Sequence, residues 1–261
     1  MDLGVYTWFG FMYPFSEIIK LIKEAGFRSV MTWWGDEFIN FVGPKKQHPE
    51  IIRKAGLELE NVHFPFENVN DIWEDTVAGQ ETFDQYCSYI DELKLYDIPT
   101  AVVHTTSGDY PPPYSQLGLD RFKRLIERAE KNNVNIALEN VRKPEYMDSL
   151  FENIKSDRLK FCYDSGHENC FTPGNDFLAK YGDKLAALHL HDNDGTNDQH
   201  LLPFMGNVKW ERIMAHLKRL EYKGPLAFEI DSQYIDVSKE YTASEYLSEA
   251  FKRCSKLLDF A

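Results

Sequence analysis

The sequence predicts an α/β fold, a (β/α)8 TIM barrel, in a single domain that spans residues 1–261. Short apolar, β-branched runs alternate with amphipathic helical patterns along the chain, and no linker interrupts them. We count eight strand-like runs, and their strict alternation with about eight helices is typical of this barrel. No Gly-x-Gly-x-x-Gly motif follows the first strand, so the rival doubly wound sheet loses its main support.

The predicted strands are rich in β-branched and aromatic residues. In chain order they cover Leu3–Trp8, Arg28–Trp34, Leu59–His63, Thr100–His104, Asn135–Glu139, Leu159–Asp164, Leu185–His191 and Pro225–Asp231.

The segments between the strands carry apolar residues at helical spacing. We expect the first helix to start from an N-cap at Ser16 and to stop at Gly26, because serine favours N-caps and glycine favours the position after a helix. The other predicted helices lie near Lys46–Ala55, Ala78–Tyr96, Leu117–Lys131, Tyr146–Ile154, Val208–Leu220 and Ser244–Leu258.

Composition and charge narrow the class of partner. No apolar run approaches the roughly 18 residues of a membrane helix, so we expect no membrane association. The net charge is −13 and no basic patch is visible, so we expect no nucleic-acid partner. The four cysteines show no Cys-x-x-Cys pairing and no signal peptide is visible, which indicates reduced thiols and a cytoplasmic protein. The oligomeric state stays open, and a homo-oligomer is one alternative.

Acids and histidines occur repeatedly where a predicted strand ends. Such residues are costly in a buried strand unless they are paired or bound to a metal. In a (β/α)8 barrel, the carboxyl ends of the strands form the active-site face. The residues at or just past these ends are His63, His104, Glu139, Asp164, His167, His189 and Glu229.

Four of these residues form a candidate metal site. Glu139, Asp164, His189 and Glu229 end strands five to eight, which are neighbours around the barrel. Three carboxylates and one imidazole suit Mn²⁺, Zn²⁺, Co²⁺ or Mg²⁺. Each residue alone is also explained as a paired core residue, but the set of four has no Arg or Lys beside it.

In these four residues and their order along the chain, the sequence resembles the xylose isomerase-like barrels. This family includes sugar isomerases and epimerases and the apurinic-site endonucleases. The resemblance covers Leu3 to Asp231 and maps the metal ligands of the epimerase branch onto the four residues above. Asp164-Ser165-Gly166-His167 is similar to the family's Asp-x-x-His motif, in which the histidine touches substrate or a second metal.

The endonuclease branch of this family uses three zinc ions, and the chain has candidates for the additional ligands. His63-Phe64-Pro65-Phe66 is similar to its His-x-Pro-aromatic motif, His104 to its next histidine, and Asp198-Gln199-His200 to its Asp-x-His. Two segments depart from this branch: His191-Asp192-Asn193-Asp194 lacks its lysine, and Phe204-Met205-Gly206-Asn207 replaces its Gly-x-Gly turn.

The resemblance implies a metal-dependent isomerase or epimerase of a sugar or sugar phosphate, so the expected partner is a small carbohydrate. The metal would stabilise an enediolate, and Glu139 and Glu229 would exchange the proton with carbon. The main alternative is a zinc-dependent apurinic-site endonuclease or phosphodiesterase, in which His63, His104, His167, Asp198 and His200 complete a multinuclear site. A non-catalytic metal- or sugar-binding barrel and a dehydratase are further alternatives.

Aromatic residues cluster near the ends of the first three strands. Trp8, Trp33, Trp34 and Phe66 are candidates for a wall against the carbon face of a sugar, with packing at the barrel rim as the alternative. Arg142 and Lys143 follow Glu139, and we interpret them as solvated loop residues rather than as contacts to an anionic substrate group.

Overall fold

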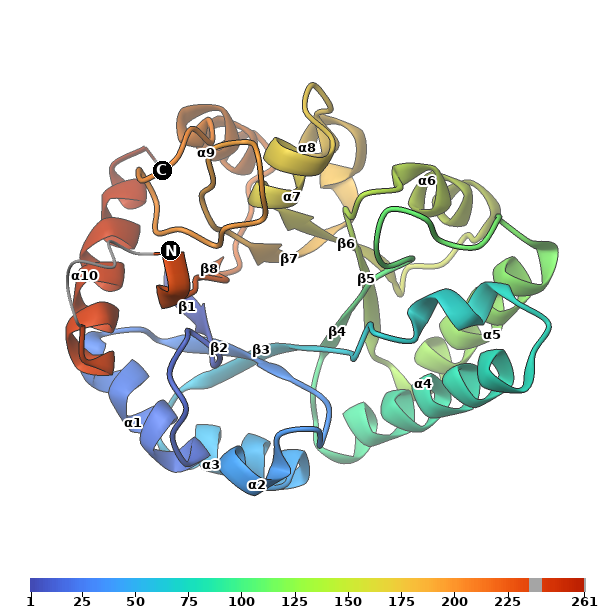
Figure 1. Ribbon diagram of the computed structural model, residues 1–261, viewed down its shortest axis with the longest axis horizontal. Helices are drawn as coiled ribbons and strands as arrows, with labels where there is room; N and C mark the ends of the chain where they lie inside the picture. The colour runs from blue at the N-terminus through green and yellow to red at the C-terminus, as the bar shows by residue number, and fades with distance from the viewer. Residues whose placement is uncertain (235–240, 261) are drawn as a thin grey trace.

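Eight parallel strands form the wall of a nearly closed barrel in the computed structural model, which describes residues 1–234 and 241–260 (Figure 1). The helices lie around the outside of this wall, so the predicted (β/α)8 fold is confirmed. The strands are β1 (Leu3–Tyr6), β2 (Ser29–Trp33), β3 (Glu58–His63), β4 (Thr100–Val103), β5 (Asn135–Glu139), β6 (Leu159–Asp164), β7 (Leu185–His189) and β8 (Leu226–Phe228).

The helices mostly follow the predicted amphipathic segments. The described α-helices are α1 (Phe15–Ala25), α2 (Ile39–Val42), α3 (His48–Lys54), α4 (Val77–Leu95), α5 (Gln116–Asn132), α6 (Pro144–Asn153), α7 (Ser165–Phe171), α8 (Phe177–Tyr181), α9 (Trp210–Arg219) and α10 (Ala243–Ser255). Within the described residues, no helix combines the length and the apolar composition that crossing a bilayer requires.

Strand pairing follows chain order from β1 to β7, and β8 pairs with β1 through Leu3 and Leu226. The ring closes between β7 and β8 by a single parallel bridge, Leu190 to Phe228. In this bridge, the Leu190 amide donates to the Ala227 carbonyl at 2.9 Å, and the Glu229 amide donates to the Leu190 carbonyl at 3.1 Å. The closure therefore holds the chain segments that carry His189 and Glu229 side by side.

Several boundaries differ from the prediction. The first helix starts at Phe15, because the carbonyl of Pro14 accepts from the amides of Glu17 and Ile18, so Ser16 is not its N-cap. Gly26 ends that helix in the left-handed conformation at φ +110°, as predicted. The strand ladder of β7 stops at His189 rather than at His191. Two helices that were not predicted, α7 and α8, lie between β6 and β7.

The inside of the barrel contains a layer of small residues directly below the polar strand ends. Val102, Ala137, Cys162 and Ala187 form a buried apolar cluster of their own. Side chains two positions apart on a strand point to the same face. The residues two positions later are therefore directed inward at the upper end of the barrel: His104, Glu139, Asp164 and His189.

Outside the barrel, α3 packs against α1 through a buried histidine. The ring of His48 stacks on Phe15 with 3.6 Å between the ring centres. Burial lowers the pKa of His48 from 6.5 to about 4, although the carbonyls of Val42 and Gly43 act in the opposite direction. His48 is therefore neutral in the folded protein at neutral pH.

The first prediction concerns stability in mild acid. Between pH 6.5 and about 4 the unfolded chain takes up a proton at His48 that the folded chain does not, so this residue destabilises the fold as pH falls. We expect this contribution to change the free energy of unfolding by about 2 kcal/mol between about pH 7.5 and about pH 5. Urea titrations of wild type and His48→Phe at both pH values measure it. A variant with the same pH dependence as wild type would contradict the assignment.

Candidate functional site

The predicted polar residues gather at one end of the barrel, because parallel strands place all their carboxyl ends on the same face. Four of these residues are the last residues of β3, β5, β6 and β7. The remaining two strand-end residues directly follow β4 and β8. In chain order the six residues are His63, His104, Glu139, Asp164, His189 and Glu229.

Glu139 lies at the centre of this group, with only 1% of its surface exposed. Its Oε2 atom lies 3.1 Å from Nε2 of His63 and 3.0 Å from Nε2 of His104. Its Oε1 atom lies 3.1 Å from Nδ1 of His189 and 3.4 Å from Nδ1 of His167. Burial alone raises the pKa of Glu139, but the imidazoles of His189 and His104 outweigh burial and hold that pKa well below its usual range.

Glu229 shares His189 with Glu139. Its Oε2 atom lies 2.9 Å from the same Nδ1 atom, and its side chain is 19% exposed. Burial raises the pKa of Glu229, but His189 and His200 lower it to about 2. Both carboxylates are therefore ionised at neutral pH.

Asp164 ends β6 and also starts α7. Its Oδ1 atom accepts from the His167 amide at 2.6 Å, which makes Asp164 the N-cap of α7 and fixes the spacing of the Asp-x-x-His motif. The Asn140 side chain holds the backbone of Asp164 at both its amide and its carbonyl, each at 2.8 Å. Oδ2 of Asp164 is buried and has no hydrogen-bond partner.

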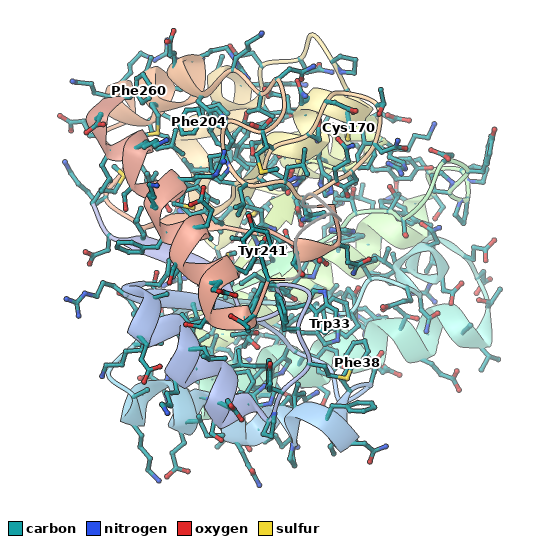
Figure 2. The ribbon with its side chains drawn as sticks, turned by 60° about the vertical axis from the view of Figure 1, so that its left-hand side comes forward. Trp33, Phe38, Cys170, Phe204, Tyr241 and Phe260 are labelled. Atoms are coloured by element: carbon teal, nitrogen blue, oxygen red, sulfur yellow. The ribbon has the colours of Figure 1, made fainter. Side chains whose placement is uncertain are left out.

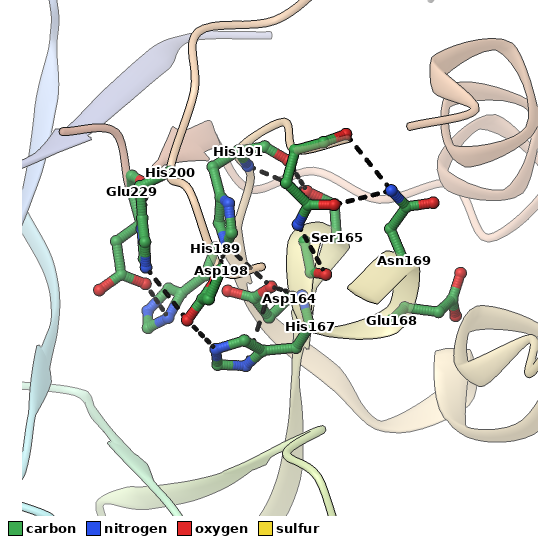
Figure 3. Close-up of polar contacts among 12 residues, drawn as sticks. Asp164, Ser165, His167, Glu168, Asn169, His189, His191, Asp198, His200 and Glu229 are labelled. Atoms are coloured by element: carbon green, nitrogen blue, oxygen red, sulfur yellow. Dashed lines mark hydrogen bonds and ion pairs between the residues drawn. The ribbon is translucent and has the colours of Figure 1, made fainter. Parts of the chain in front are cut away.

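A second cluster surrounds Asp198, in the loop between β7 and α9 (Figure 3). Oδ2 of Asp198 lies 3.2 Å from Nε2 of His167 and 3.4 Å from Nε2 of His200. His200 is oriented by the backbone, because its Nδ1 atom lies 2.7 Å from the Glu229 carbonyl. Burial lowers the pKa of His200, but Asp198 raises it to about 10.

His191 joins the two clusters, although it was not among the predicted site residues. Its Nε2 atom lies 3.1 Å from Oδ1 of Asp164, and its ring stacks on His200 with 4.0 Å between the ring centres. Gly166 makes room for it, because a Cβ atom there would lie 1.9 Å from the His191 ring. The available signal was its spacing of two from His189, which directs both rings to the same side of the chain.

The donor set fits a divalent cation. Each of Glu139, Asp164, His189 and Glu229 offers one ligand atom, and these atoms all lie within 4.8 Å of one another. The unpartnered Oδ2 of Asp164 is a buried acceptor that a cation would satisfy. Three carboxylates around one imidazole are hard ligands for a divalent ion.

Three further groups of described residues also meet the distance requirement for a metal. One contains Asp164, His167 and His191, and a second contains His191, Asp198 and His200. His63 forms another group with Glu139 and His189. The clustered ligands therefore extend beyond one four-residue site.

A cavity of about 310 Å³ opens directly above Glu139 and Glu229. His63, His104, His167, Asp198 and His200 also contribute to its lining. All five residues that were predicted as substrate contacts or additional ligands thus lie around one cavity. Its volume is within the range of cavities that bind small molecules.

A second, more apolar chamber of about 340 Å³ adjoins the first, since Phe66 and Glu229 line both. Trp8, Trp33 and Phe38 all contribute to its wall, and Figure 2 labels Trp33 and Phe38. The rings of Trp8 and Phe38 stack with 6.3 Å between their centres.

Trp34 does not lie on this wall, which corrects the prediction. Its side chain is completely buried, and its Nε1 atom donates to Oε2 of Glu92 on α4 at 3.0 Å. Consecutive residues at the end of a strand point to opposite faces. Trp33 therefore faces the chamber, while Trp34 packs between the barrel and α4.

The chain matches known proteins over most of its length. A family model described as "Xylose isomerase-like TIM barrel" matches residues 19–254. The uncharacterised protein y4fM of Sinorhizobium fredii is 30% identical over 253 residues, which cover 81% of this chain and 79% of that protein.

Solved structures have the same fold. A D-tagatose 3-epimerase-like protein superposes with a TM-score of 0.77 at 22% identity, covering 99% of this chain and 98% of that one. The D-psicose 3-epimerase of Clostridium cellulolyticum H10 superposes with a TM-score of 0.76 at 15% identity, covering 100% and 98%. The family match along the chain identifies this protein as a member of the xylose isomerase-like TIM barrel family.

Proposed function

We propose that this protein is a divalent-metal-dependent isomerase or epimerase of a carbohydrate, with Glu139 and Glu229 as its proton-transfer groups. The observation that carries the proposal is the contact of both carboxylates with one imidazole. Nδ1 of His189 lies 3.1 Å from Oε1 of Glu139 and 2.9 Å from Oε2 of Glu229. Both carboxylates lie at the floor of one cavity. An ionised carboxylate acts as a base, and a carboxylate that has taken up a proton acts as an acid.

In the proposed reaction, the residues of the site bind the metal, transfer the proton and contact the substrate. A divalent cation bound by Glu139, Asp164, His189 and Glu229 would polarise a substrate carbonyl and stabilise negative charge on the adjacent substrate oxygens. One of the two glutamates removes a proton from carbon, and the other, after it has taken up a proton from water, returns a proton to carbon. His167 lines the same cavity and hydrogen-bonds a substrate oxygen.

The relatives support a carbohydrate substrate. Structures of proteins named as D-tagatose 3-epimerase-like and D-psicose 3-epimerase superpose along nearly the whole chain. The aromatic chamber beside the cavity also agrees with such a substrate, because aromatic rings pack against the carbon face of a sugar.

A screen for proton exchange tests the proposal without knowledge of the exact substrate. Ketoses, inositols and their phosphates are incubated with the Mn²⁺-loaded protein in deuterated water, and incorporation at carbon is followed by NMR. We expect exchange at the carbon beside the carbonyl of at least one carbohydrate. No exchange with any of them, on a protein with bound metal, would contradict the proposal.

A zinc-dependent phosphodiesterase or apurinic-site endonuclease is the second candidate. The observation in its favour is the number of clustered ligands, since His63 and His104 both contact Oε2 of Glu139 and Asp198 has its own histidines. Metal analysis separates the two functions. About one ion per chain favours the isomerase, and two or three zinc ions favour the phosphodiesterase.

The second prediction concerns the paired glutamates. Glu139→Gln and Glu229→Gln should each lower the rate of proton exchange by about 10²–10⁴-fold, because each removes a general acid–base group. Circular dichroism should show an intact fold. Glu152→Gln, on the exposed side of α6, is the matched control and should retain the wild-type rate. Near wild-type exchange in either active-site variant with full metal occupancy would rule out the paired mechanism.

The third prediction concerns metal removal. A chelator should abolish exchange and lower the thermal midpoint while the barrel stays folded. The loss of stability follows because clustered carboxylates remain without their counter-charge, whereas the apolar layers of the barrel do not depend on the ion. Melting curves of metal-loaded and chelated protein measure the shift. An unchanged midpoint for protein shown to contain metal beforehand would contradict this expectation.

The fourth prediction separates the two candidate enzymes. Duplex DNA with an abasic site should bind weakly and be cleaved slowly or not at all, because the net charge is −13. Contacts with several phosphates would give a salt dependence of affinity with a slope of about −0.9 per contact, and we expect no such slope. Fluorescence anisotropy over a salt series measures binding, and a gel assay measures nicking. Efficient metal-dependent nicking would overturn the isomerase assignment.

A further inference from the structure

We propose that the substrate carries an anionic group, a carboxylate or a phosphate, which Arg142 binds at the rim of the catalytic cavity. This inference rests on the proposed function and narrows its substrate class to acidic carbohydrates.

The structure places Arg142 on the cavity and not in a fully solvated loop. Arg142 lies in the loop between β5 and α6, three residues after Glu139, and lines the same cavity as Glu139 and His167. Its side chain is 32% exposed. Among the described residues that line the cavity, it is the sole lysine or arginine. Any cation–anion contact to a substrate from this lining, apart from the histidines and a bound metal, must come from Arg142.

The guanidinium is held in place but leaves donors unused. Its Cζ atom lies 3.4 Å from the centre of the Phe171 ring, and Nε lies 3.1 Å from Oδ1 of Asp109. The Asp109 side chain is 74% exposed, so this ion pair compensates the charge of Arg142 only weakly. Nη1 is shielded from solvent and has no hydrogen-bond partner. A planar guanidinium presents a fork of donors that matches carboxylate and phosphate oxygens.

A second unused donor lies on the same cavity. Thr106 is 1% exposed and lines the cavity, and its Oγ1 atom is buried without a hydrogen-bond partner. Groups of this kind are normally satisfied in a folded protein, by protein atoms, water or a ligand. The Thr106 hydroxyl and Nη1 of Arg142 both lack an acceptor, and two such donors fit an oxygen-rich anion.

The charged residues at the floor of the cavity are acidic, whereas Arg142 at its rim is basic. Glu139, Asp198 and Glu229 give the floor of the cavity a negative charge that a metal would balance. Among the residues that the structure describes, Arg142 forms no ion pair with any of these three carboxylates, and its ion-pair partner Asp109 lies outside the cavity lining. Its charge is therefore available to a bound molecule that spans the cavity from the metal ligands to the rim.

The test compares ketoses that differ at one end only. Binding of D-fructose, D-fructuronate and D-fructose 6-phosphate to the metal-loaded protein is measured by calorimetry, and proton exchange is measured on the same three compounds. We expect one charged compound to bind at least about tenfold more tightly than fructose, since hydrogen bonds to charged groups are strong. The preferred compound identifies the anion as a carboxylate or a phosphate.

Variants then assign the preference. Arg142→Gln should reduce the ratio of charged to neutral affinity to near one, and Arg142→Lys should retain part of it. Lys143→Gln removes the same charge from the neighbouring residue, which does not line the cavity, and should keep the wild-type ratio.

Three results overturn the inference: equal affinity for charged and neutral ketoses, a preference that survives Arg142→Gln, or binding of none of the three. Exchange on fructose without any preference for the anions would overturn this inference but leave the proposed function intact. Anion-selective binding through Arg142 without proton exchange would overturn the proposed function but leave this inference intact.

Discussion

The carboxylate of Glu139 is almost completely buried, and the organisation of the site follows from the need to hold its charge. Burial opposes ionisation, so the charge persists only because imidazoles from four different segments contact its two oxygens. Parallel strands deliver three of these rings to one level of the barrel, and α7 delivers the fourth. The barrel therefore places imidazoles close enough to the buried carboxylate of Glu139 to stabilise its charge.

Closure of the barrel and formation of the site depend on the same few contacts. The bridge between Leu190 and Phe228 joins the last two strands and holds His189 near Glu229. The helix cap at Asp164 fixes the backbone of His167 and leaves one carboxylate oxygen without a partner. The backbone geometry thus leaves a buried acceptor, Oδ2 of Asp164, free at the position where a metal would bind.

The space above this group has two parts of different chemical character. One part lies over the histidines and carboxylates and ends at Arg142, and the other is lined by aromatic rings that include Trp8 and Trp33. A molecule with several oxygens and a carbon face matches this combination. The acidic overall charge is compatible with such a substrate and opposes a polyanionic partner such as DNA.

The sequence by itself determined the fold class and most of the polar centre. Both are encoded locally, since strand periodicity predicts the barrel and the final residue of each strand is directed to the active-site face. Only the tertiary structure decided which side chains face the cavity beyond the strand ends. Trp34 and His191 illustrate this, because the direction of each depends on where its strand stops and on the neighbour that packs against it. The position of Arg142 also could not be predicted from the sequence. A loop side chain takes its direction from contacts that no local pattern encodes, and for Arg142 these contacts are with Phe171 and Asp109.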